Sequence, residues 1–450
     1  MSSVVQIETK PSAFDDKRAP EQSVMDKCVH CGFCLPACPT YVLWGEEMDS
    51  PRGRIWMMRM GKDGNAKLDT NFQTHMDNCL GCMACMTACP SGVEYNKLIE
   101  DTRGQVERHV ARSFADRLFR EMLFQTFPYP GRLRLLAAPM WVYQRTGLQK
   151  LVRATGLLKL LPKRLEAMES LLPTVPSSFA RKTRVASVAK SDQPRVGMLT
   201  GCVQDVFFGR VNRATARVLA AEGFDVVVPE QQGCCGALMV HSGLDDDAAV
   251  LAKKTIAAFE SAGVETIVIN AAGCGSTMKE YGHLLRDDPA WAGRAKAFSA
   301  KCKDISEVLA AQPARAKRHP LPMRVAYHDA CHLQHAQGVR EEPRSLLGGI
   351  PGMEVREIAE ASLCCGSAGV YNLLHPEPAD ELGDRKVTNL LETGVEAVVS
   401  ANPGCLLQLM HGLRRRGKEA MPAFHMVELL DASIRGVGRE AVMRGDGESA

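Results

Sequence analysis

The chain has 450 residues, of which 45% are hydrophobic, and its 55 basic and 52 acidic side chains leave a formal net charge of +3. A chain of this length holds two or three domains with a sizeable core, and this balance of charge gives no indication of nucleic-acid binding. Residues 1–20 are polar, which argues against a secretory signal, and no apolar run is long enough to cross a bilayer. The 17 cysteines do not fit a small disulfide scaffold, so we expect metal ligation in a reducing cytoplasm.

The cysteines divide the chain into regions of different composition. Two tight groups lie near the N-terminus, a Leu-, Arg- and Lys-rich stretch without cysteine follows, and the remaining cysteines lie in the C-terminal half. The predicted divisions are a flexible N-terminus (1–22), a ferredoxin-type domain (23–105), a helical connector and linker (106–194), two cysteine-rich repeats (195–315 and 316–435) and a flexible tail (436–450).

The two N-terminal groups, CVHCGFCLPACP and CLGCMACMTACP, both follow the C-x2-C-x2-C-x3-C-P spacing of bacterial ferredoxins. In that pattern three thiolates hold one [4Fe-4S] cluster and the fourth, turned away by the proline, reaches the neighbouring cluster. The predicted ligands are Cys28, Cys31, Cys34 and Cys89 for cluster one, and Cys79, Cys82, Cys85 and Cys38 for cluster two. Zinc knuckles are the alternative, but zinc sites usually separate two cysteine pairs by a longer spacer. Clusters held by four thiolates transfer electrons, so we predict no catalytic residue here.

The C-terminal half is an internal repeat with an offset of about 130 residues. VGMLTGC, ending at Cys202, matches RVAYHDAC, ending at Cys331, and GCCGALMV matches LCCGSAGV. Short β-branched runs at Thr266–Asn270 and Ala397–Ser400 alternate with helical patterns such as Asn212–Glu222. The pattern predicts an α+β or α/β protein, in which a helical ferredoxin-type domain and a helical linker precede a duplicated α/β domain with parallel sheets.

Each repeat has one Cys, a Cys-Cys-Gly (CCG) doublet and a further Cys, which we treat as two possible metal sites. The members are Cys202, Cys234, Cys235 and Cys274 in the first repeat, and Cys331, Cys364, Cys365 and Cys405 in the second. A doubled cysteine before glycine is typical of a tight turn that presents two thiolates to a metal, and these positions follow predicted strands, where parallel sheets bind ligands. Buried structural thiols are the alternative, and Cys302, outside both sets, is interpreted as one.

Histidines and a basic helical stretch leave further alternatives open. His328, His332 and His335 surround Cys331, where they could hydrogen-bond a cluster sulfur or carry protons to a quinone or disulfide; helix-capping or core roles are the alternative, for them and for His425. Leu148–Leu172 alternates leucines with lysine and arginine, which is typical of a membrane-surface helix or of a solvated helix packed on its own domain.

Two ferredoxin motifs followed by two CCG repeats resemble the iron–sulfur subunits of glycolate oxidase over about residues 23–432. The resemblance is strongest in EEMDSPRGRIWMMR (46–59), CPSGVEYNKLIEDTR (89–103) and YHDACHLQHAQGVR (327–340). It implies a partner subunit that oxidises glycolate at FAD, and electron flow through this chain's clusters to a quinone or other membrane acceptor, peripherally on the cytoplasmic face of the membrane. No G-x-G-x-x-G after a strand, P-loop or nucleophile elbow is found, so we expect no flavin on this chain.

The architecture also resembles iron–sulfur subunits of D-lactate and glycerol-3-phosphate dehydrogenases and of heterodisulfide reductases. The heterodisulfide reductase pattern ends each repeat in C-x-x-C, whereas here Thr277 and Gln408 take the last position. Four cysteines per repeat remain, which argues against disulfide reduction as the activity and leaves the cluster type in the repeats open. A zinc-stabilised scaffold without redox function is a third hypothesis.

Overall fold

The computed structural model describes residues 10–183 and 193–445, and the first region is helical. Its elements are α1 (Gln22–Met25), α2 (Pro39–Trp44), η1 (Glu47–Asp49), α3 (Pro51–Lys62), α4 (Thr70–Asn78), α5 (Ala84–Thr87) and α6 (Tyr95–His109). Helix α3 begins where Ser50 caps the main-chain nitrogen of Gly53 at 3.0 Å and Pro51 follows. Its buried Ile55 and Met58 share one core with Leu98 of α6.

The chain before α1 differs from the flexible N-terminus expected over residues 1–22. Phe14 is buried, with its ring centroid 6.2 Å from that of Phe72 on α4. The carboxylate of Asp15 pairs with Arg108 on α6 at 2.8 Å. One aromatic side chain and one ion pair therefore fix a segment whose composition is otherwise polar. Residues 1–9 lie outside the described residues.

The connector is a set of short helices. They are α7 (Phe114–Phe124), α8 (Pro130–Arg145), α9 (Leu148–Ala154), η2 (Leu157–Leu160) and α10 (Lys163–Ser170). The stretch Leu148–Leu172 forms no single amphipathic helix, because Gly156 has a positive φ of 70° and Pro162 precedes α10. Buried Leu133 and Ala137 of α8 pack on Val206 of the first repeat. The expected boundary at residue 105 falls inside α6.

The two repeats follow, each with helices around a parallel sheet. The first contains β1 (Arg195–Met198), α11 (Val203–Phe207), α12 (Gly209–Ala221), β2 (Asp225–Val227), α13 (Ala237–Val240), α14 (Asp245–Ser261), β3 (Thr266–Ile269), α15 (Ala272–Lys279), α16 (Tyr281–Leu284), α17 (Ala292–Lys301), β4 (Cys302–Asp304) and α18 (Ile305–Ala310). The second contains β5 (Met323–His328), η3 (His332–Ala336), α19 (Glu341–Gly348), β6 (Met353–Glu357), α20 (Tyr371–Leu374), α21 (Pro376–Glu392), β7 (Ala397–Ser400), α22 (Pro403–Arg415), β8 (Ala423–His425), α23 (Met426–Arg435) and α24 (Arg439–Arg444).

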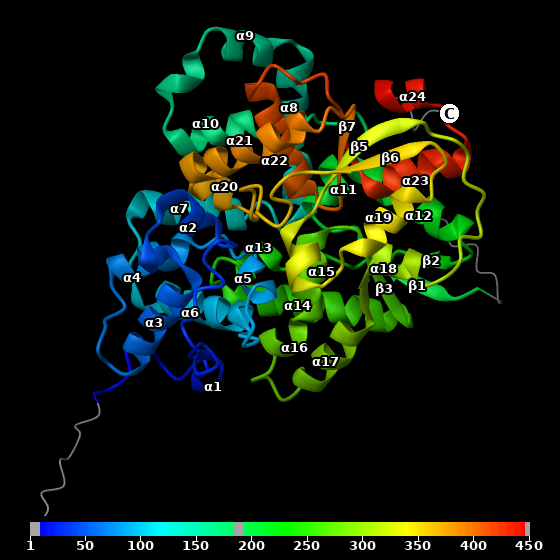
Figure 1. Ribbon diagram of the computed structural model, residues 1–450. Helices are drawn as coiled ribbons and strands as arrows, with labels where there is room; N and C mark the ends of the chain where they lie inside the picture. The colour runs from blue at the N-terminus through cyan, green and yellow to red at the C-terminus, as the bar shows by residue number, and fades with distance from the viewer. Residues whose placement is uncertain (1–9, 184–192, 446–450) are drawn as a thin grey trace, which may run out of the picture.

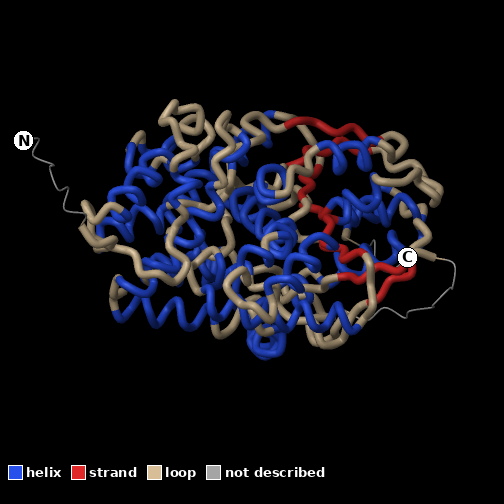
Figure 2. The backbone as a smooth tube through the Cα atoms, turned by 90° about the horizontal axis from the view of Figure 1, so that it is seen from below, coloured by secondary structure: helices blue, strands red, loops and turns tan. Residues whose placement is uncertain are grey.

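The sheets have the same topology, β2-β1-β3-β4 and β6-β5-β7-β8, and every strand pair is parallel. This confirms the predicted fold class. Helices α12 and α23 pack against each other, so one hydrophobic core runs through both repeats. Figure 2 shows the strands gathered toward one end of the molecule and the helical N-terminal region at the other. Helix α24, with buried Val442, lies in part of the tail expected to be flexible; residues 446–450 lie outside the described residues.

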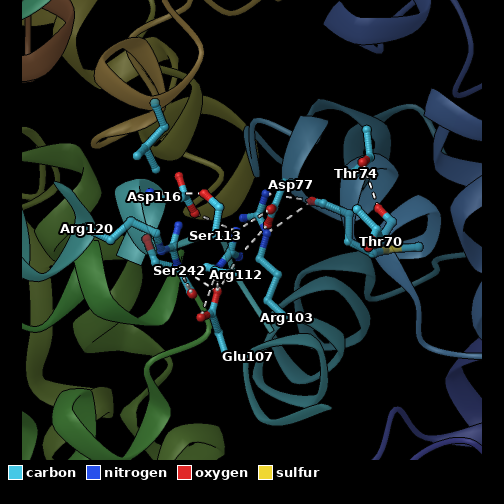
Figure 3. Close-up of polar contacts among 12 residues, drawn as sticks. Thr70, Thr74, Asp77, Arg103, Glu107, Arg112, Ser113, Asp116, Arg120 and Ser242 are labelled. Carbon is cyan, nitrogen blue, oxygen red and sulfur yellow. Dashed lines mark hydrogen bonds and ion pairs between the residues drawn. The ribbon is translucent and has the colours of Figure 1, made fainter. Parts of the chain in front are cut away.

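The helical domain, the connector and the first repeat are held together by buried arginines (Figure 3). Arg112 pairs with Asp77 of α4 at 2.8 Å, and also with Glu107. Arg120 of α7 pairs with Glu107 at 2.7 Å and donates to the main-chain oxygen of Ser242 at 3.0 Å. Because these groups are largely buried, the network fixes the position of the ferredoxin-type domain against the first repeat.

Candidate metal centres

The four cysteines predicted for cluster one line a single pocket of the helical domain, namely Cys28, Cys31, Cys34 and Cys89. His30 and Gly32 have positive φ values of 54° and 87°, so the loop turns tightly enough for thiols two residues apart to converge. A Cβ at Gly32 would lie 2.9 Å from Nη1 of Arg52, which donates to the main-chain oxygen of His30 at 3.1 Å. Cys85 of the second group also lines this pocket, so the two groups adjoin.

The second group is buried, and Cys38 of the first motif lies with it. Burial raises the pKa values of Cys82 and Cys85 well above the usual range, and Cys38 is among the neighbouring thiols that raise both. Cys38 therefore lies near the second group as well as near Cys34 of its own group. Cys82 is also close to Cys331 of the second repeat, whose charge is the second cause of its raised pKa, and both pack in one buried cluster with Leu363 and Cys364.

Two buried arginines give Cys79 a different environment. Burial alone raises the pKa of this thiol, but the guanidinium groups of Arg54 and Arg103 reverse the shift and hold its pKa below the usual range. Arg54 is anchored by Asp49 at 2.9 Å. The main-chain nitrogen of Gly81 and the hydroxyl of Tyr95 donate to the Cys79 sulfur at 3.3 Å and 3.8 Å. Donors and positive charge around a sulfur stabilise a thiolate ligand.

The eight CCG cysteines gather at the carboxyl ends of the strands. Cys202 follows β1 and Cys331 follows β5, while the doublets follow β2 and β6, and the fourth cysteines stand on α15 and α22, directly after β3 and β7. The Cys202 and Cys234 sulfurs are 3.4 Å apart, and the corresponding Cys331 and Cys364 sulfurs are 3.8 Å apart. Each repeat therefore folds its own quartet at the same place in its sheet.

In both quartets the second cysteine of the doublet has a lowered pKa, and in the second quartet the pKa of Cys331 is lowered as well, first by its hydrogen bond with Cys364. Hydrogen bonds from Cys234 and then Cys274 lower the pKa of Cys235 well below the usual range. Cys364 and then Cys405 do the same for Cys365. Main-chain Gly236 donates to the Cys234 sulfur at 3.4 Å. Such hydrogen-bonded sets of thiols are suited to deprotonation on metal binding.

His328 makes the second quartet different from the first. A ring nitrogen of His328 and the sulfur atoms of Cys365 and Cys405 all lie within 4.8 Å of one another, and the three residues are buried. Neither ring nitrogen of His328 has a hydrogen-bond partner among the described residues. In the first repeat the corresponding position, three residues before Cys202, is Leu199. The second quartet can thus offer a nitrogen ligand that the first cannot.

The other histidines have separate roles. His332 lies with its Nδ1 atom 3.5 Å from the Cys331 sulfur. His335 bridges Thr87 of α5 and the main-chain oxygen of Ser362, at 2.9 Å and 3.0 Å. His425 caps α23 by accepting from the nitrogen of Val427 at 3.2 Å. His335 and His425 therefore have structural contacts, whereas His332 faces the cysteines.

Gln408 and Cys302, which lie outside the quartets, add no further ligand to them. Gln408, in place of the last cysteine of a C-x-x-C, donates to the main-chain oxygen of Ala379 at 2.9 Å and accepts from Asn372 at 3.0 Å. Cys302 is buried and donates to the main-chain oxygen of Phe298 at 3.5 Å. Burial raises its pKa above the usual range, as in an inert structural thiol.

Both CCG quartets face one cavity of about 290 Å³. Much of the remaining lining is apolar and comes from the connector; its residues include Phe127, Leu133, Leu136, Met140, Met168 and Leu171. Figure 1 shows α8, α9 and α10 above α20, α21 and α22. His241 and His332 also line the cavity, with ring centroids 4.7 Å apart. The sequence did not predict that His241 and the apolar residues of the connector line this site, because they belong to no recognisable motif.

The donor sets fit iron–sulfur clusters. Several thiols converge in each group, and in the buried second group burial together with mutual repulsion opposes their simultaneous ionisation, as the raised pKa values of Cys82 and Cys85 indicate. Iron supplies the positive charge that such thiolates need. The chain thus contains four cysteine groups of suitable chemistry.

Three families match successive parts of the chain: a 4Fe-4S dicluster domain over residues 24–93, the linker region of the glycolate oxidase iron–sulfur subunit over 115–172, and the cysteine-rich CCG domain over 196–279 and 325–410. The domains thus follow the order predicted from the sequence, and the cofactors of the chain are iron–sulfur clusters.

The chain is 40% identical to the "Probable glycolate oxidase iron-sulfur subunit" of Bacillus subtilis (strain 168), over 94% of this chain and 97% of that protein. It is 36% identical to the "Glycolate oxidase iron-sulfur subunit" of Escherichia coli (strain K12), over 92% and 95%. One polypeptide of the CoM/CoB fumarate reductase of Methanothermobacter marburgensis is 31% identical over 78% of this chain and 71% of its own length. The chain belongs to the family of glycolate oxidase iron–sulfur subunits and is an electron-transfer subunit of an oxidoreductase.

Proposed function

We propose that this chain receives electrons from an FAD-containing partner that oxidises glycolate or a related 2-hydroxy acid, and delivers them to a quinone or other membrane acceptor. The observation that carries the proposal is the proximity of Cys82 and Cys331, which pack in one buried cluster. It joins the ferredoxin-type cysteines to the CCG cysteines without an intervening gap. Electron transfer between centres requires such proximity in a continuous protein medium.

The proposed cluster ligands follow the four cysteine groups. They are Cys28, Cys31, Cys34 and Cys89; Cys79, Cys82, Cys85 and Cys38; Cys202, Cys234, Cys235 and Cys274; and Cys331, Cys364, Cys365 and Cys405. Thiolate-bound clusters exchange one electron at a time, whereas oxidation of a hydroxy acid needs a two-electron acceptor such as a flavin. The names of the two bacterial relatives support glycolate as the substrate of the complex.

The partner's docking surface is proposed around the first cysteine group. Cys31 is exposed, and Val29 and Phe33 beside it are each 66% exposed. Trp56 of α3, whose ring lies 5.7 Å from that of His30, is 51% exposed. Large apolar side chains around a redox centre are typical of a protein interface. Electrons would enter here.

The connector is proposed to bind a membrane surface. Most of the large apolar side chains that the described residues expose lie on it: Phe114, Leu118, Met122, Leu135, Leu136, Val142, Leu148, Leu151, Leu157, Leu160, Leu161 and Leu165. Its exposed charges are mainly basic, including Arg132, Arg145, Lys150 and Lys163. No helix in the described ranges is long and apolar enough to span a bilayer. An apolar, basic surface binds anionic lipid headgroups peripherally.

The lipid proposal is tested by sedimentation with vesicles. Wild-type complex should sediment with phosphatidylcholine vesicles that contain phosphatidylglycerol, and much less with phosphatidylcholine alone. The double variant Leu148→Ser, Leu151→Ser should lose binding, while Val250→Ser, which alters an exposed residue of the first repeat, should retain it. Equal sedimentation of all three would contradict the proposal.

The electron-transfer proposal is tested by purifying the chain with the subunits that accompany it. Dye reduction is then measured with glycolate, D-lactate, L-lactate and glycerol 3-phosphate. Glycolate should give the highest kcat/KM, and the preparation should contain FAD on another polypeptide. If no flavoprotein accompanies the chain and no hydroxy acid reduces the dye, the proposal fails.

Disulfide reduction is a second candidate, favoured by the similarity to a polypeptide of the CoM/CoB fumarate reductase and by the single cavity that both quartets share. The same preparation decides it. Reduction of an added disulfide by reduced dye, with no hydroxy-acid activity, would favour this candidate.

A further inference from the structure

The cavity that both CCG quartets line has two chemically different kinds of lining. The cysteines supply thiolate ligands, while the apolar part, with Leu133 and Leu136 of α8 and Leu171 after α10, offers no ligand for iron. A cluster held by the cysteines has no need of such a lining. Apolar lining with few polar groups is typical of a site for a hydrophobic small molecule.

Among the polar side chains that line the cavity outside the cysteine quartets, His241 is placed to serve that molecule. His241, directly after α13, lines the cavity, and neither of its ring nitrogens has a hydrogen-bond partner among the described residues. Its side chain is only 13% exposed. An unpaired imidazole at the wall of a buried apolar cavity costs free energy unless a ligand bonds it.

The carboxyl group of Glu100 lies next to His241 and connects the cavity with a second pocket. Oε1 of Glu100 on α6 is 3.7 Å from Nδ1 of His241. Glu100 also lines a second, acidic pocket with Asp101, Asp245 and Glu280, the last partly exposed. The Glu100–His241 pair is thus the link between this acidic pocket and the apolar cavity.

We propose that the apolar part of the cavity binds a quinone ring, and that His241, resupplied by Glu100, donates the protons that its reduction requires. The proposal rests on the proposed function, because the 2-hydroxy acid oxidised at the partner subunit supplies the electrons. Oxidation to the 2-oxo acid releases two electrons and two protons; the quinone takes two electrons and gains one proton on each carbonyl oxygen. His241 donates each proton and regains it from Glu100, which regains it from the acidic pocket.

The charges around the pair agree with this direction of transfer. Burial, and then Glu280, Asp101 and Asp245, raise the pKa of Glu100 well above its usual value, against Arg103, which favours the protonated carboxyl group. Burial, His332 and Arg103 lower the pKa of His241, so a donated proton is not retained. The acidic pocket also contains Arg18, His283 and Arg286.

Binding is tested without any electron donor, so that this result does not depend on the identity of the substrate. Decyl-benzoquinone is titrated into the oxidised complex by equilibrium dialysis, and one equivalent should bind. Leu136→Arg places a charge at the cavity and should weaken binding about tenfold or more. Val250→Arg, at a residue of the first repeat that is outside the cavity lining and 67% exposed, is the control and should bind as wild type does. Absence of binding, or equal binding by both variants, would overturn the site.

The proton path is tested by comparing two acceptors. Reduction of decyl-benzoquinone consumes protons, whereas ferricyanide accepts electrons alone. Glu100→Gln and His241→Phe should lower kcat for the quinone by about 100-fold with little change in KM, and should lower ferricyanide reduction far less. Equal losses with both acceptors would mean a structural role, and no loss with the quinone would exclude the path. If wild type binds quinone but no hydroxy acid reduces ferricyanide, the proposed function fails while the site stands.

Discussion

Nη1 of Arg103 donates to the main-chain oxygen of His241 at 2.7 Å, and the same guanidinium donates to the main-chain oxygens of Met76, at 3.0 Å, and Cys79. One buried side chain thus ties the second ferredoxin-type cysteine group to the wall of the cavity. Since 138 positions separate Arg103 and His241 along the chain, the contact fixes how two domains meet.

Arg103→Met should therefore loosen the domain interface and slow electron transfer across it. Three buried carbonyl oxygens lose their donor, which costs about 2–4 kcal/mol of stability. The thermal unfolding midpoint and the rate of quinone reduction per bound iron should both fall. Arg117→Met, at an exposed arginine of α7, is the control and should change neither. A wild-type midpoint for Arg103→Met would contradict the role of this contact.

Iron content tests the assignment of the first cysteine group. Cys31→Ser should lose one [4Fe-4S] cluster, about four iron atoms per chain, because Cys31 lines the first pocket with three other predicted ligands. Cys302→Ala should keep the full iron content, since its thiol lies outside all four groups. Iron and acid-labile sulfide are measured on anaerobically reconstituted protein. Equal iron in both variants would refute the assignment.

His328→Leu tests the difference between the quartets. It gives the second repeat the residue that the first has at Leu199, so both quartets then offer thiolates only. Electron paramagnetic resonance of the reduced protein should lose or shift one signal of the CCG region, and nitrogen hyperfine coupling present in the wild type should vanish. Leu199→His is the reciprocal variant. Unchanged spectra for His328→Leu would show that the imidazole does not contact the cofactor.

The buried carboxyl group of Asp245 should make the stability of the fold depend on pH. Burial raises its pKa from 3.8 to about 6, against the nearby Arg18. The native state therefore binds this proton more tightly than the unfolded state does, so stability falls as pH rises from about 4 to about 6, by about 3 kcal/mol in total. Asp245→Asn should remove this loss, raising the unfolding midpoint above that of wild type at pH 8 but not at pH 4.

Asp246→Asn is the matched control on the same helical turn. Asp246 is 78% exposed and pairs with Lys17 at 2.8 Å, which lowers its pKa. Its removal should cause a small loss of stability at pH 8, opposite in sign to the effect of Asp245→Asn. If both variants gain stability at pH 8, surface charge rather than burial of Asp245 explains the result.

The cysteine pattern allowed the fold class and the family to be predicted, because the spacing of ligands within a loop and the alternation of strand and helix patterns along the chain are local properties. Parallel sheets with cysteines at their carboxyl ends followed from the repeat, and the structure confirms them. The family comparison confirms the resemblance to glycolate oxidase iron–sulfur subunits.

The features that could not be predicted from the sequence depend on contacts between segments far apart along the chain. The interaction of Glu100 with His241 joins α6 to the first repeat, and Cys82 comes near Cys331 only after the ferredoxin-type domain has packed against the second repeat. The burial of Phe14 was missed for the same reason, since a lone aromatic residue in a polar stretch gives no periodic signal. Side chains that no motif marks can be placed only once the tertiary structure is known.

The exposed apolar side chains of the connector and of the Cys31 loop have a practical consequence. A chain that presents leucines and tryptophans to water on two separate surfaces has a strong tendency to self-associate when it is produced alone. Expression together with its partner, in the presence of a mild detergent, should yield monodisperse material where expression of the isolated chain yields aggregates.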